Sequence, residues 1–523
     1  MRLLITLVLA ANAFAAENPA ARWWSHILFL ADDKLEGRNT GSEGHRKAAQ
    51  YVAGEFEKLG LKPAGGAAYV QPVKLTTSKI LESECSLAIV RAGAVEPLTL
   101  GDANFGRGQK HVESLEAPLV FAGYALKIPE AKHDDFAGLD VKGKVVVYLS
   151  GAPESIPGPV RAHFSSGSER SRMLREVGAV GAIGIQNPRS TDVPWARSTL
   201  SRLQMSMGLA GGSTDETGGL LSVSVNAERA EKWFEGSGHT FAEITALDRA
   251  GKTLPRFALP VPVRAKVRVE TGDAESQNVV ALLPGRDKKL SHEYIVMTAH
   301  LDHLGSGAPI KGDGIYNGAM DNASGIATLI EVAAGLRESK AKLRRSVLFL
   351  AVTGEEKGLL GSRFYANNPT VPKGSIVANL NSDMFMPLFP LKILTTMGLD
   401  ESSLGDSIRK VAASMGITVE ADPEPERNRF IRSDQYSFIR GGVPALAFKV
   451  GYVKDSPESA IAKKWIAERY HAPSDDVNQP VDFSAAADFN RVMQKLLVEI
   501  ANADDRPRWK PDSFFRRFAK GPS

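Results

Sequence analysis

Three apolar runs, each followed by residues that can bind a metal, most constrain how this chain can fold. The first run ends at His300, the second covers Val347 to Val352 and precedes Glu355 and Glu356, and the third precedes Asp383. Near-continuous apolar runs of this length are typical of strands buried on both faces of a parallel sheet. Because open α/β sheets build their sites outside the carboxyl ends of the strands, these side chains are expected to meet at one edge.

The segment YIVMTAHLDHLG, which contains the end of the first run, places a carboxylate two residues after a histidine. A histidine at one strand end is more often structural than a ligand, and the other two strand ends are what favour the ligand role here. If the strand continues, Asp302 points to the same side as His300, so its carboxylate is expected to hold the second ring nitrogen. We expect His303 to be a loop residue with local hydrogen bonds and no ligand role. Asp321 ends the following Gly-rich loop, and His471 lies far downstream in a polar stretch.

Length and composition describe a large globular chain. At 523 residues it is too long for one ordinary domain, so we predict a large α/β unit with an insertion or second domain. The 64 basic and 60 acidic residues give a formal net charge of +4, which does not indicate a nucleic-acid partner. Because Cys85 is the one cysteine, no intramolecular disulfide is possible, and core burial and bound metal are expected to stabilise the fold.

The first residues have the pattern of a signal for export. Arg2 precedes a short apolar segment, and small residues follow at Ala13 and Ala15, so residues 1–15 are predicted to be a signal peptide. No later apolar run reaches about 18 residues, so we expect no stable membrane span. A glycan on the N-glycosylation sequon at Asn322 would obstruct the predicted site, which favours a bacterial origin. We therefore expect a secreted or periplasmic protein.

Several motifs occur in the order typical of one enzyme family. These are AHLDHLG, NGAMDNASG, TGEEKGLLGS, NSDMF, RSDQYSF followed by GGVPA, and finally YHAPSDD. Together they resemble the M28 family of zinc aminopeptidases. The upstream LADDKLEGRNTGSEGHRKAAQYVAGEFEKLGLKP is similar to the region before the catalytic core of that family. The segments DVKGKVVVYLSG and GAVGAIGIQNP resemble the protease-associated (PA) domain that these enzymes often carry.

The resemblance and the changes of composition predict how the chain is divided. Residues 16–76 would form the N-terminal part of the peptidase domain, and 77–270 an inserted PA-like domain. Residues 271–503 would form the metallopeptidase catalytic domain, and the basic, aromatic segment 504–523 a poorly ordered tail. The fold class we predict is α/β, with a mixed, mostly parallel sheet flanked by helices and an inserted β-rich domain.

The resemblance implies a site for two zinc ions. His300 and Asp383 would bind one ion, Glu356 and His471 would bind the other, and Asp321 would bridge both. Three carboxylates and two imidazoles suit the charge and borderline softness of zinc. A carboxylate shared by two ions would keep them about 3.5 to 4 Å apart, as in other two-metal sites.

Further roles are implied for residues next to these ligands. Glu355 would be the general base, and Asp302 would orient His300. Arg432 and Tyr436 are candidates for steadying the substrate carbonyl, against the alternative that they only pack. Phe385, where many relatives carry a small residue, suggests an apolar wall of a substrate pocket, against the alternative of core packing.

The function we expect is hydrolysis of N-terminal residues from peptides that have a free N-terminus. Three alternatives remain open: glutaminyl cyclisation by a single zinc, a carboxypeptidase of the same fold, and a non-catalytic peptide-binding protein. Arg432 or Arg440 could supply the cationic pocket that a carboxypeptidase needs. The sequence makes no prediction of oligomeric state.

Overall fold

The computed structural model describes residues 19–66, 68–190, 193–211, 220–427 and 429–519. The signal peptide predicted over residues 1–15 lies outside these ranges. The chain forms two compact units: the first contains Met1–Lys74, Glu275–Pro423 and Arg432–Ser523, and the second contains Leu75–Ala274 and Glu424–Ile431. The sequence did not predict that the short segment Glu424–Ile431 belongs to the second unit.

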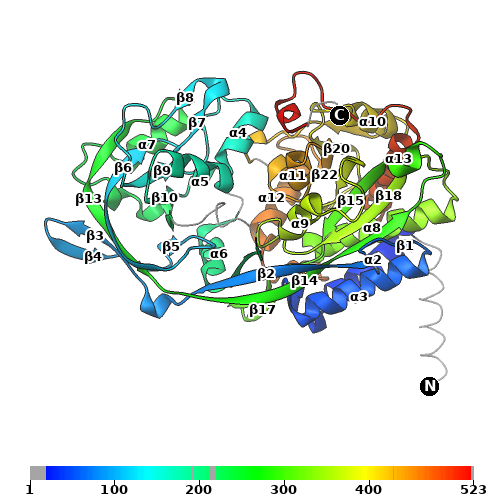
Figure 1. Cartoon of the computed structure of the whole chain (residues 1–523), viewed down its shortest axis with the longest axis horizontal. Coiled ribbons are helices and arrows are strands. Elements are labelled where there is room, and N and C mark those ends of the chain that lie inside the picture. The colour runs from blue at the N-terminus through cyan, green and yellow to red at the C-terminus, as the bar shows by residue number, and fades with distance from the viewer. Residues whose placement is uncertain (1–18, 67, 191–192, 212–219, 428, 520–523) are drawn as a thin grey trace. The chain divides into compact units, whose positions relative to one another are not determined.

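The first unit is built on a mixed sheet (Figure 1). From β14 onward, the strands of this sheet run in the order β14-β18-β15-β19-β22-β20-β21. β15 is parallel to β18 and β19, β19 is parallel to β22, and antiparallel pairs join β14 to β18 and β20 to β22. The bounds of these strands are β14 (Val269–Leu283), β15 (Tyr294–His300), β18 (Ser346–Val352), β19 (Ile376–Asn381), β20 (Ile393–Met397), β21 (Thr418–Glu420) and β22 (Ala445–Gly451). The predicted α/β fold with a mixed, mostly parallel sheet is confirmed.

The register of the parallel strands aligns their carboxyl ends. His300 pairs with Val352 of β18, and Thr298 pairs with Asn381 of β19. Asp383 follows β19 by two residues and therefore emerges beside His300. The sheet thus brings the residues that follow three separate strands to a single edge.

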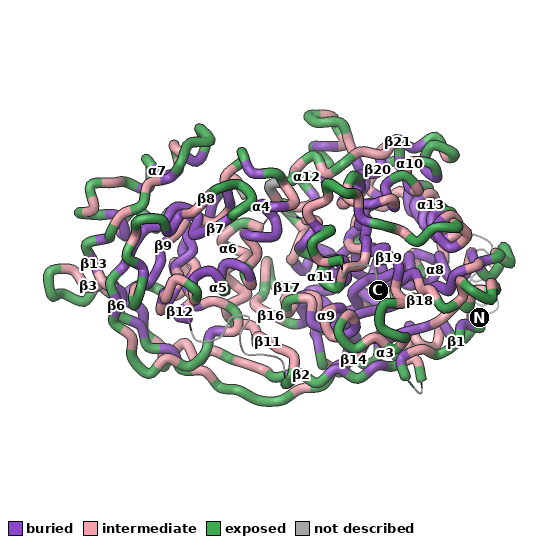
Figure 2. Tube along the Cα trace, turned by 45° about the horizontal axis from the view of Figure 1, so that its top comes forward, coloured by how far each residue is buried: buried purple, intermediate pink, exposed green. Residues whose placement is uncertain are grey.

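Helices cover the sheet and bury its apolar faces. Those of the first unit include α2 (Pro19–Leu30), α3 (Glu43–Lys58), α8 (Ser324–Glu338), α9 (Leu360–Asn367), α10 (Leu404–Ala413), α11 (Gln435–Arg440), α12 (Pro457–Arg469) and α13 (Phe483–Asn502). α8 is apolar on almost every side and packs against β15 and β18, with α2 and α13 also in contact with it. Such a helix must be enclosed, and Figure 2 shows it buried among its neighbours.

An ion pair ties α2 to the buried α8. The guanidinium of Arg22 lies 3.1 Å from Glu331, which is 2% exposed, and 2.8 Å from the exposed Glu338. The indole of Trp23 donates to Thr328 of the same helix at 3.1 Å. These contacts fix α2 against the helix that begins directly behind Asp321.

The C-terminal segment is ordered up to residue 519, so the prediction of a poorly ordered tail is wrong for the part that the structure describes. Trp509 is 8% exposed, and its indole donates to the main-chain oxygen of Gly442 at 2.9 Å. Phe515 is fully buried, and Arg345 binds the main-chain oxygens of Ala503 and Asp504. Aromatic burial holds this segment on the first unit.

The second unit contains a separate mixed sheet in the order β4-β3-β13-β6-β9-β10-β12-β5. The predicted strands in KGKVVVYLSG and GAVGAIGIQNP are confirmed as β9 and β10, with α5 before β10. The elements are β3 (Ser86–Arg91), β4 (Ala94–Pro97), β5 (Ala103–Phe105), β6 (Val112–Ala122), β9 (Val145–Leu149), β10 (Gly181–Ile185), β12 (Leu221–Val225), β13 (Arg256–Val267), α4 (Gly158–Ser165), α5 (Gly167–Glu176), α6 (Trp195–Ser198) and α7 (Phe241–Arg249). Its relation to PA domains stays a prediction.

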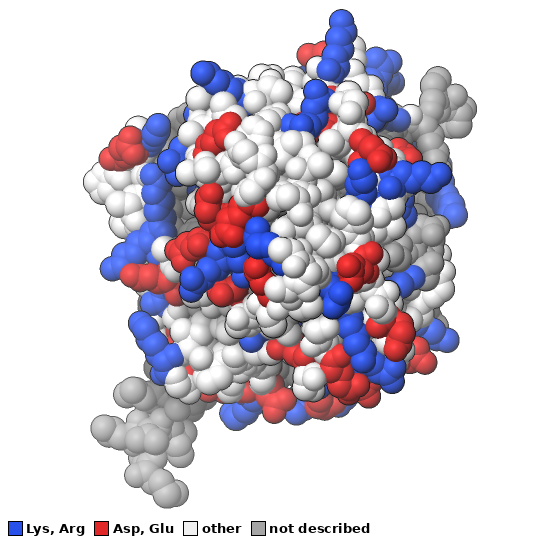
Figure 3. Space-filling model, turned by 90° about the vertical axis from the view of Figure 1, so that its left-hand side faces the viewer, with Lys and Arg blue, Asp and Glu red and all other residues white. Residues whose placement is uncertain are grey.

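Two surface features bear on partners. On the face shown in Figure 3, basic and acidic side chains are interspersed, consistent with the balanced net charge. Among the described residues, every helix is too short or too polar to cross a membrane.

We predict that the buried imidazole of His45 makes the stability of the first unit depend on pH. Burial, with a contribution from Arg38, lowers the pKa of His45 from 6.5 to about 3. Between these values the unfolded chain binds the proton and the folded chain does not. Above about pH 6.5 the free energy of unfolding therefore does not depend on this group. Below that pH it decreases, by up to about 1.4 kcal/mol per pH unit.

Urea unfolding between about pH 5 and pH 7 measures this effect. His45→Leu removes the titrating group, so its free energy of unfolding should change less with pH than that of the unaltered protein. His292→Leu, at an exposed position, is the control and should keep the original dependence. An unchanged dependence in His45→Leu would contradict the prediction.

Candidate metal centre

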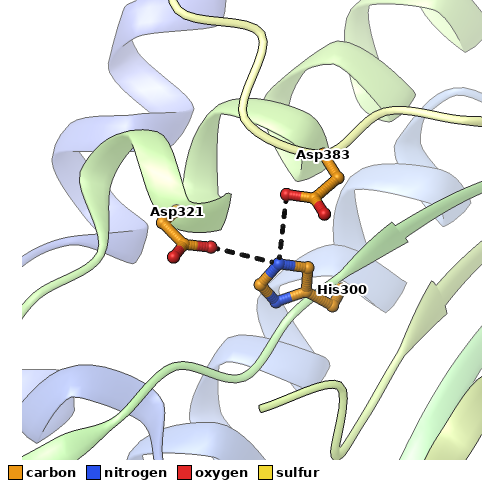
Figure 4. A group of neighbouring side chains, drawn as sticks. All are labelled: His300, Asp321 and Asp383. Atoms are coloured by element: carbon orange, nitrogen blue, oxygen red, sulfur yellow. Dashed lines mark ion pairs between the residues drawn. The ribbon is translucent and has the colours of Figure 1, made fainter. Parts of the chain in front are cut away.

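The imidazole of His300 lies at the carboxyl end of β15 and faces two carboxylates. In Figure 4 both carboxylates point toward this ring. Nε2 of His300 is 3.2 Å from Oδ1 of Asp321 and 3.6 Å from Oδ1 of Asp383. The residue is 1% exposed, and its Nδ1 atom lies 3.0 Å from the main-chain oxygen of Asp302. Because a carbonyl only accepts hydrogen bonds, Nδ1 carries a proton and Nε2 is the ring nitrogen that faces the carboxylates. Burial lowers the pKa of His300, but Glu355, Asp321 and Asp383 together raise it well above its ordinary value.

The carboxylate of Asp302 has partners that the sequence did not predict. It accepts the main-chain N–H of Glu355 at 3.1 Å, the N–H of Glu356 at 3.4 Å and the hydroxyl of Thr40 at 2.9 Å. The prediction that this carboxylate holds the second ring nitrogen of His300 is therefore wrong, because the Asp302 carbonyl takes that place. The carboxylate instead fixes the turn after β18 that carries both glutamates.

A second group of side chains meets on the other side of Asp321. Nε2 of His471 lies 3.3 Å from Oδ2 of Asp321 and 3.4 Å from Oε2 of Glu356. Asp321 thus directs Oδ1 toward His300 and Oδ2 toward His471. We call His300, Asp321 and Asp383 the His300 half-site, and Asp321, Glu356 and His471 the His471 half-site.

The spacing of these atoms fits zinc. With zinc–ligand distances of about 2.0 to 2.1 Å, two ligands of a tetrahedral ion lie roughly 3.3 to 3.4 Å apart. The distances from the histidine nitrogens to the carboxylates, 3.2, 3.3, 3.4 and 3.6 Å, lie close to this value. Oδ1 of Asp383 is also buried without a hydrogen-bond partner among the described residues. The three donors of the His300 half-site lie close enough together to hold one ion, and the distances from His471 to Asp321 and Glu356 are of the same size.

The facing histidines, with Lys449 at Asp383, lower the pKa of the carboxyls of Asp321, Asp383 and Glu356 although burial opposes this. Two neighbouring carboxyls lack such compensation. Burial raises the pKa of Glu355 well above its ordinary value; His300 opposes this, and the nearby carboxylates of Asp383 and Glu356 add to it. Burial likewise raises the pKa of Asp434 to about 7. A divalent cation in each half-site would compensate for this negative charge.

Asp475 positions the shared aspartate, and sequence reasoning assigned it no role. Its carboxylate is fully buried and accepts the main-chain N–H of Met320 at 2.9 Å and of Asp321 at 3.0 Å. The only signal in the sequence was its place in YHAPSDD, four residues after His471. Hydrogen bonds of this kind fix the orientation of a metal ligand through its main chain.

Arg38 holds the loops on which both half-sites are built. Its buried guanidinium donates to the main-chain oxygens of Leu301 at 2.9 Å, Asn317 at 2.6 Å and Gly318 at 3.0 Å, and also to that of Leu30. Burial lowers its pKa to about 10, although nearby aspartates oppose the shift, so it remains a cation at neutral pH. The loop after β15 and the loop before Asp321 are thereby fixed to each other.

His303 lies in the loop after β15, as expected, but the expectation that its side chain makes local hydrogen bonds is wrong. Its side chain is fully buried, and its Nδ1 atom lies 2.8 Å from Oε1 of Glu356 and 3.9 Å from Oδ2 of Asp321. It therefore faces the His471 half-site.

Phe385 packs in the core, which is the alternative that the sequence left open, and its contact with substrate stays a prediction. It is 2% exposed and stacks on Phe489 of α13 with ring centroids 3.7 Å apart. Where many relatives carry a small residue, the large side chain of Phe385 packs against this helix.

Tyr470 lies beside the centre and was missed by sequence reasoning, although it directly precedes His471. Its half-buried ring lies 4.0 Å from that of His471, centroid to centroid. Burial raises its pKa well above the ordinary value; Arg432 opposes this shift, and the carboxylates of the centre increase it.

Tyr436, which the sequence suggested as a contact of the substrate carbonyl, is 7% exposed in α11. The guanidinium of Arg440 lies 5.9 Å from its ring centroid. The predicted substrate contacts of Arg432 and Tyr436 stay predictions.

Comparison with known proteins agrees with this geometry. Residues 278–497 match Peptidase family M28. This part of the chain is an M28 peptidase domain. It includes every residue of the two half-sites.

Curated relatives resemble parts of the chain. Leupeptin-inactivating enzyme 1 of Streptomyces exfoliatus is 28% identical over 195 residues, which is 37% of this chain and 40% of that protein. Leucine aminopeptidase 1 of Arthroderma gypseum is 33% identical over 125 residues, 23% of this chain and 32% of that protein. The chain thus spans less than half the length of these relatives.

Solved structures share the fold over most of the chain. An aminopeptidase from Aneurinibacillus sp. strain AM-1 superposes with a TM-score of 0.57 at 20% identity, covering 94% of this chain and 97% of that one. BSAP, a zinc aminopeptidase from Bacillus subtilis, gives 0.51 at 19% identity, covering 92% and 94%. At 20% and 19% identity, these matches show that the fold is shared.

We predict that Asp475→Asn weakens zinc binding by about 10- to 100-fold, the usual range for residues that orient metal ligands. An asparagine has one side-chain oxygen, so it cannot accept both the Met320 and Asp321 N–H groups as the carboxylate does. Competition with a chromophoric chelator measures the affinity. Asp476→Asn, at the neighbouring and more exposed carboxylate, is the control, and equal affinities in the two variants would contradict the prediction.

Proposed function

We propose that this chain is an exported, zinc-dependent aminopeptidase that hydrolyses N-terminal residues from peptides. The observation that carries the proposal is the pair of half-sites sharing Asp321, with Glu355 next to a ligand of one of them. Membership of residues 278–497 in the M28 peptidases supports the reaction class. The sequence pattern of residues 1–15 supports export.

Five side chains would hold two zinc ions. His300 and Asp383 would bind one ion, Glu356 and His471 the other, and Asp321 both. When bound, the two ions supply a water of lowered pKa and a Lewis acid that polarises the substrate carbonyl.

Glu355 would act as the general base. The turn that carries it is held by Asp302, which accepts both its N–H and that of Glu356. The side chain of Glu356 turns toward His471, whereas Glu355 is half-buried and interacts electrostatically with His300 and Asp383. Glu355 would take the proton of the attacking water and return it to the leaving amine.

Two carboxyl groups that keep exposed surface support selection of a free N-terminus. Asp383 keeps 17% of its side chain exposed, and Glu355 is half-buried, so both can reach a bound substrate. An α-ammonium group placed between them would be stabilised by their charge. Selection of this group would restrict cleavage to the first peptide bond.

Tyr470 is a candidate for stabilising the oxyanion. Because its pKa lies well above the ordinary value, its hydroxyl keeps the proton at neutral pH and can donate a hydrogen bond. A neutral donor aimed at developing charge lowers the barrier to acyl transfer. Arg432, which interacts electrostatically with Tyr470, would add positive charge near the same position.

Hydrolysis of a panel of aminoacyl amides tests the proposed function. We expect turnover of amides with a free amino group, loss of activity with a chelator, and recovery when zinc is restored. Acetylated amides and substrates with only a free carboxyl end should not be cleaved. Turnover of carboxyl-terminal substrates would favour a carboxypeptidase, and cyclisation of N-terminal glutamine a glutaminyl cyclase.

Two neighbouring substitutions separate catalysis from metal binding. Glu355→Gln should lower kcat by about 100- to 10,000-fold, the usual contribution of a general base, and should keep both zinc ions. Glu356→Gln should lose zinc from the His471 half-site. Zinc content of the purified variants, measured by mass spectrometry beside kcat, distinguishes these effects. Equal zinc loss in both variants would contradict the separate roles of the two glutamates.

A further inference from the structure

His303 is a buried imidazole that the proposed mechanism does not use. Its side chain is fully buried. Nε2 has no hydrogen-bond partner among the described residues, and Nδ1 faces the carboxylate of Glu356. Buried polar groups are nearly always paired, because leaving one unpaired costs about 1 to 3 kcal/mol. A proton or a metal ion between Nδ1 and the carboxylates that it faces would stabilise this arrangement.

The ring is aimed at the His471 half-site. Nδ1 of His303 lies 2.8 Å from Oε1 of Glu356, the oxygen opposite the one that faces His471. The same nitrogen is 3.9 Å from Oδ2 of Asp321, and its ring centroid lies 6.0 Å from that of His471. Nδ1 of His303 and one oxygen from each of Asp321 and Glu356 lie close enough together to hold one metal ion.

The surrounding backbone leaves the ring little freedom. The main-chain N–H of His303 donates to the oxygen of Arg38 at 3.3 Å. Gly318 approaches so closely that a Cβ atom there would lie 2.5 Å from Cγ of His303, and its φ of +62° also favours glycine. The packing thus holds the imidazole against Glu356.

We propose that His303 helps to bind the zinc ion of the His471 half-site, through Nδ1 and its contact with Glu356. This half-site would then have two imidazoles and two carboxylates around its ion, whereas the His300 half-site has one imidazole and two carboxylates. A second imidazole favours zinc, so the two ions would be held with different affinities. The inference rests on the proposed two-zinc centre.

Zinc binding to the full-length protein, measured by competition with a chromophoric chelator, tests this inference without relying on activity. His303→Ala should lower the affinity for one of the two zinc ions by about 10- to 100-fold and leave the affinity for the other unchanged. His303→Asn, which leaves a smaller gap and keeps a polar atom near the Nδ1 position, should fold and lose less affinity for the same ion. His45→Ala removes another fully buried imidazole from the same unit and should leave both affinities unchanged.

Cobalt substitution identifies the ion that is affected. With Co²⁺ in place of zinc, loss of His303 should change the visible absorption of one ion. If His303→Ala and His303→Asn bind both ions with the affinity of the unaltered protein, the inference is wrong. If the unaltered protein binds fewer than two ions, the proposed two-zinc function itself fails.

Discussion

The centre of this protein depends on the electrostatic cost of burying several carboxylates around one point. Asp321, Glu356 and Asp383 lie within 3.6 Å of a histidine nitrogen, and burial raises the pKa of Glu355 and Asp434. A folded chain tolerates such crowding only where cations or strong donors compensate for it. Two zinc ions would supply the largest compensating charge, so the same residues would serve both stability and catalysis.

Main-chain contacts give this arrangement its precision. Asp302 holds the turn of the two glutamates, Asp475 holds the N–H groups around Asp321, and Arg38 joins the loop after β15 to the loop before Asp321. None of these three side chains is proposed as a metal ligand. They fix the backbone from which the ligands project. Substitutions of these three side chains should therefore change metal affinity.

The sequence predicted the part of the centre that follows from strand register. His300, Glu356 and Asp383 follow apolar runs, and parallel strands bring such ends together. The roles of Asp475 and His303 could not be predicted in this way, because they depend on how loops far apart in the chain fold against each other. Similarly, the sequence left open whether Phe385 packs in the core and did not predict burial of the C-terminal segment, since burial of an aromatic side chain is decided by partners that local sequence does not reveal.

The central claim is that two ions bind on opposite sides of one shared carboxylate. Anomalous X-ray diffraction at the zinc edge, from crystals of the zinc-loaded protein, tests it most directly. The account predicts two peaks about 3.5 to 4 Å apart, one beside His300 and Asp383 and the other beside Glu356 and His471, with Asp321 between them. A single peak, or peaks away from Asp321, would contradict it.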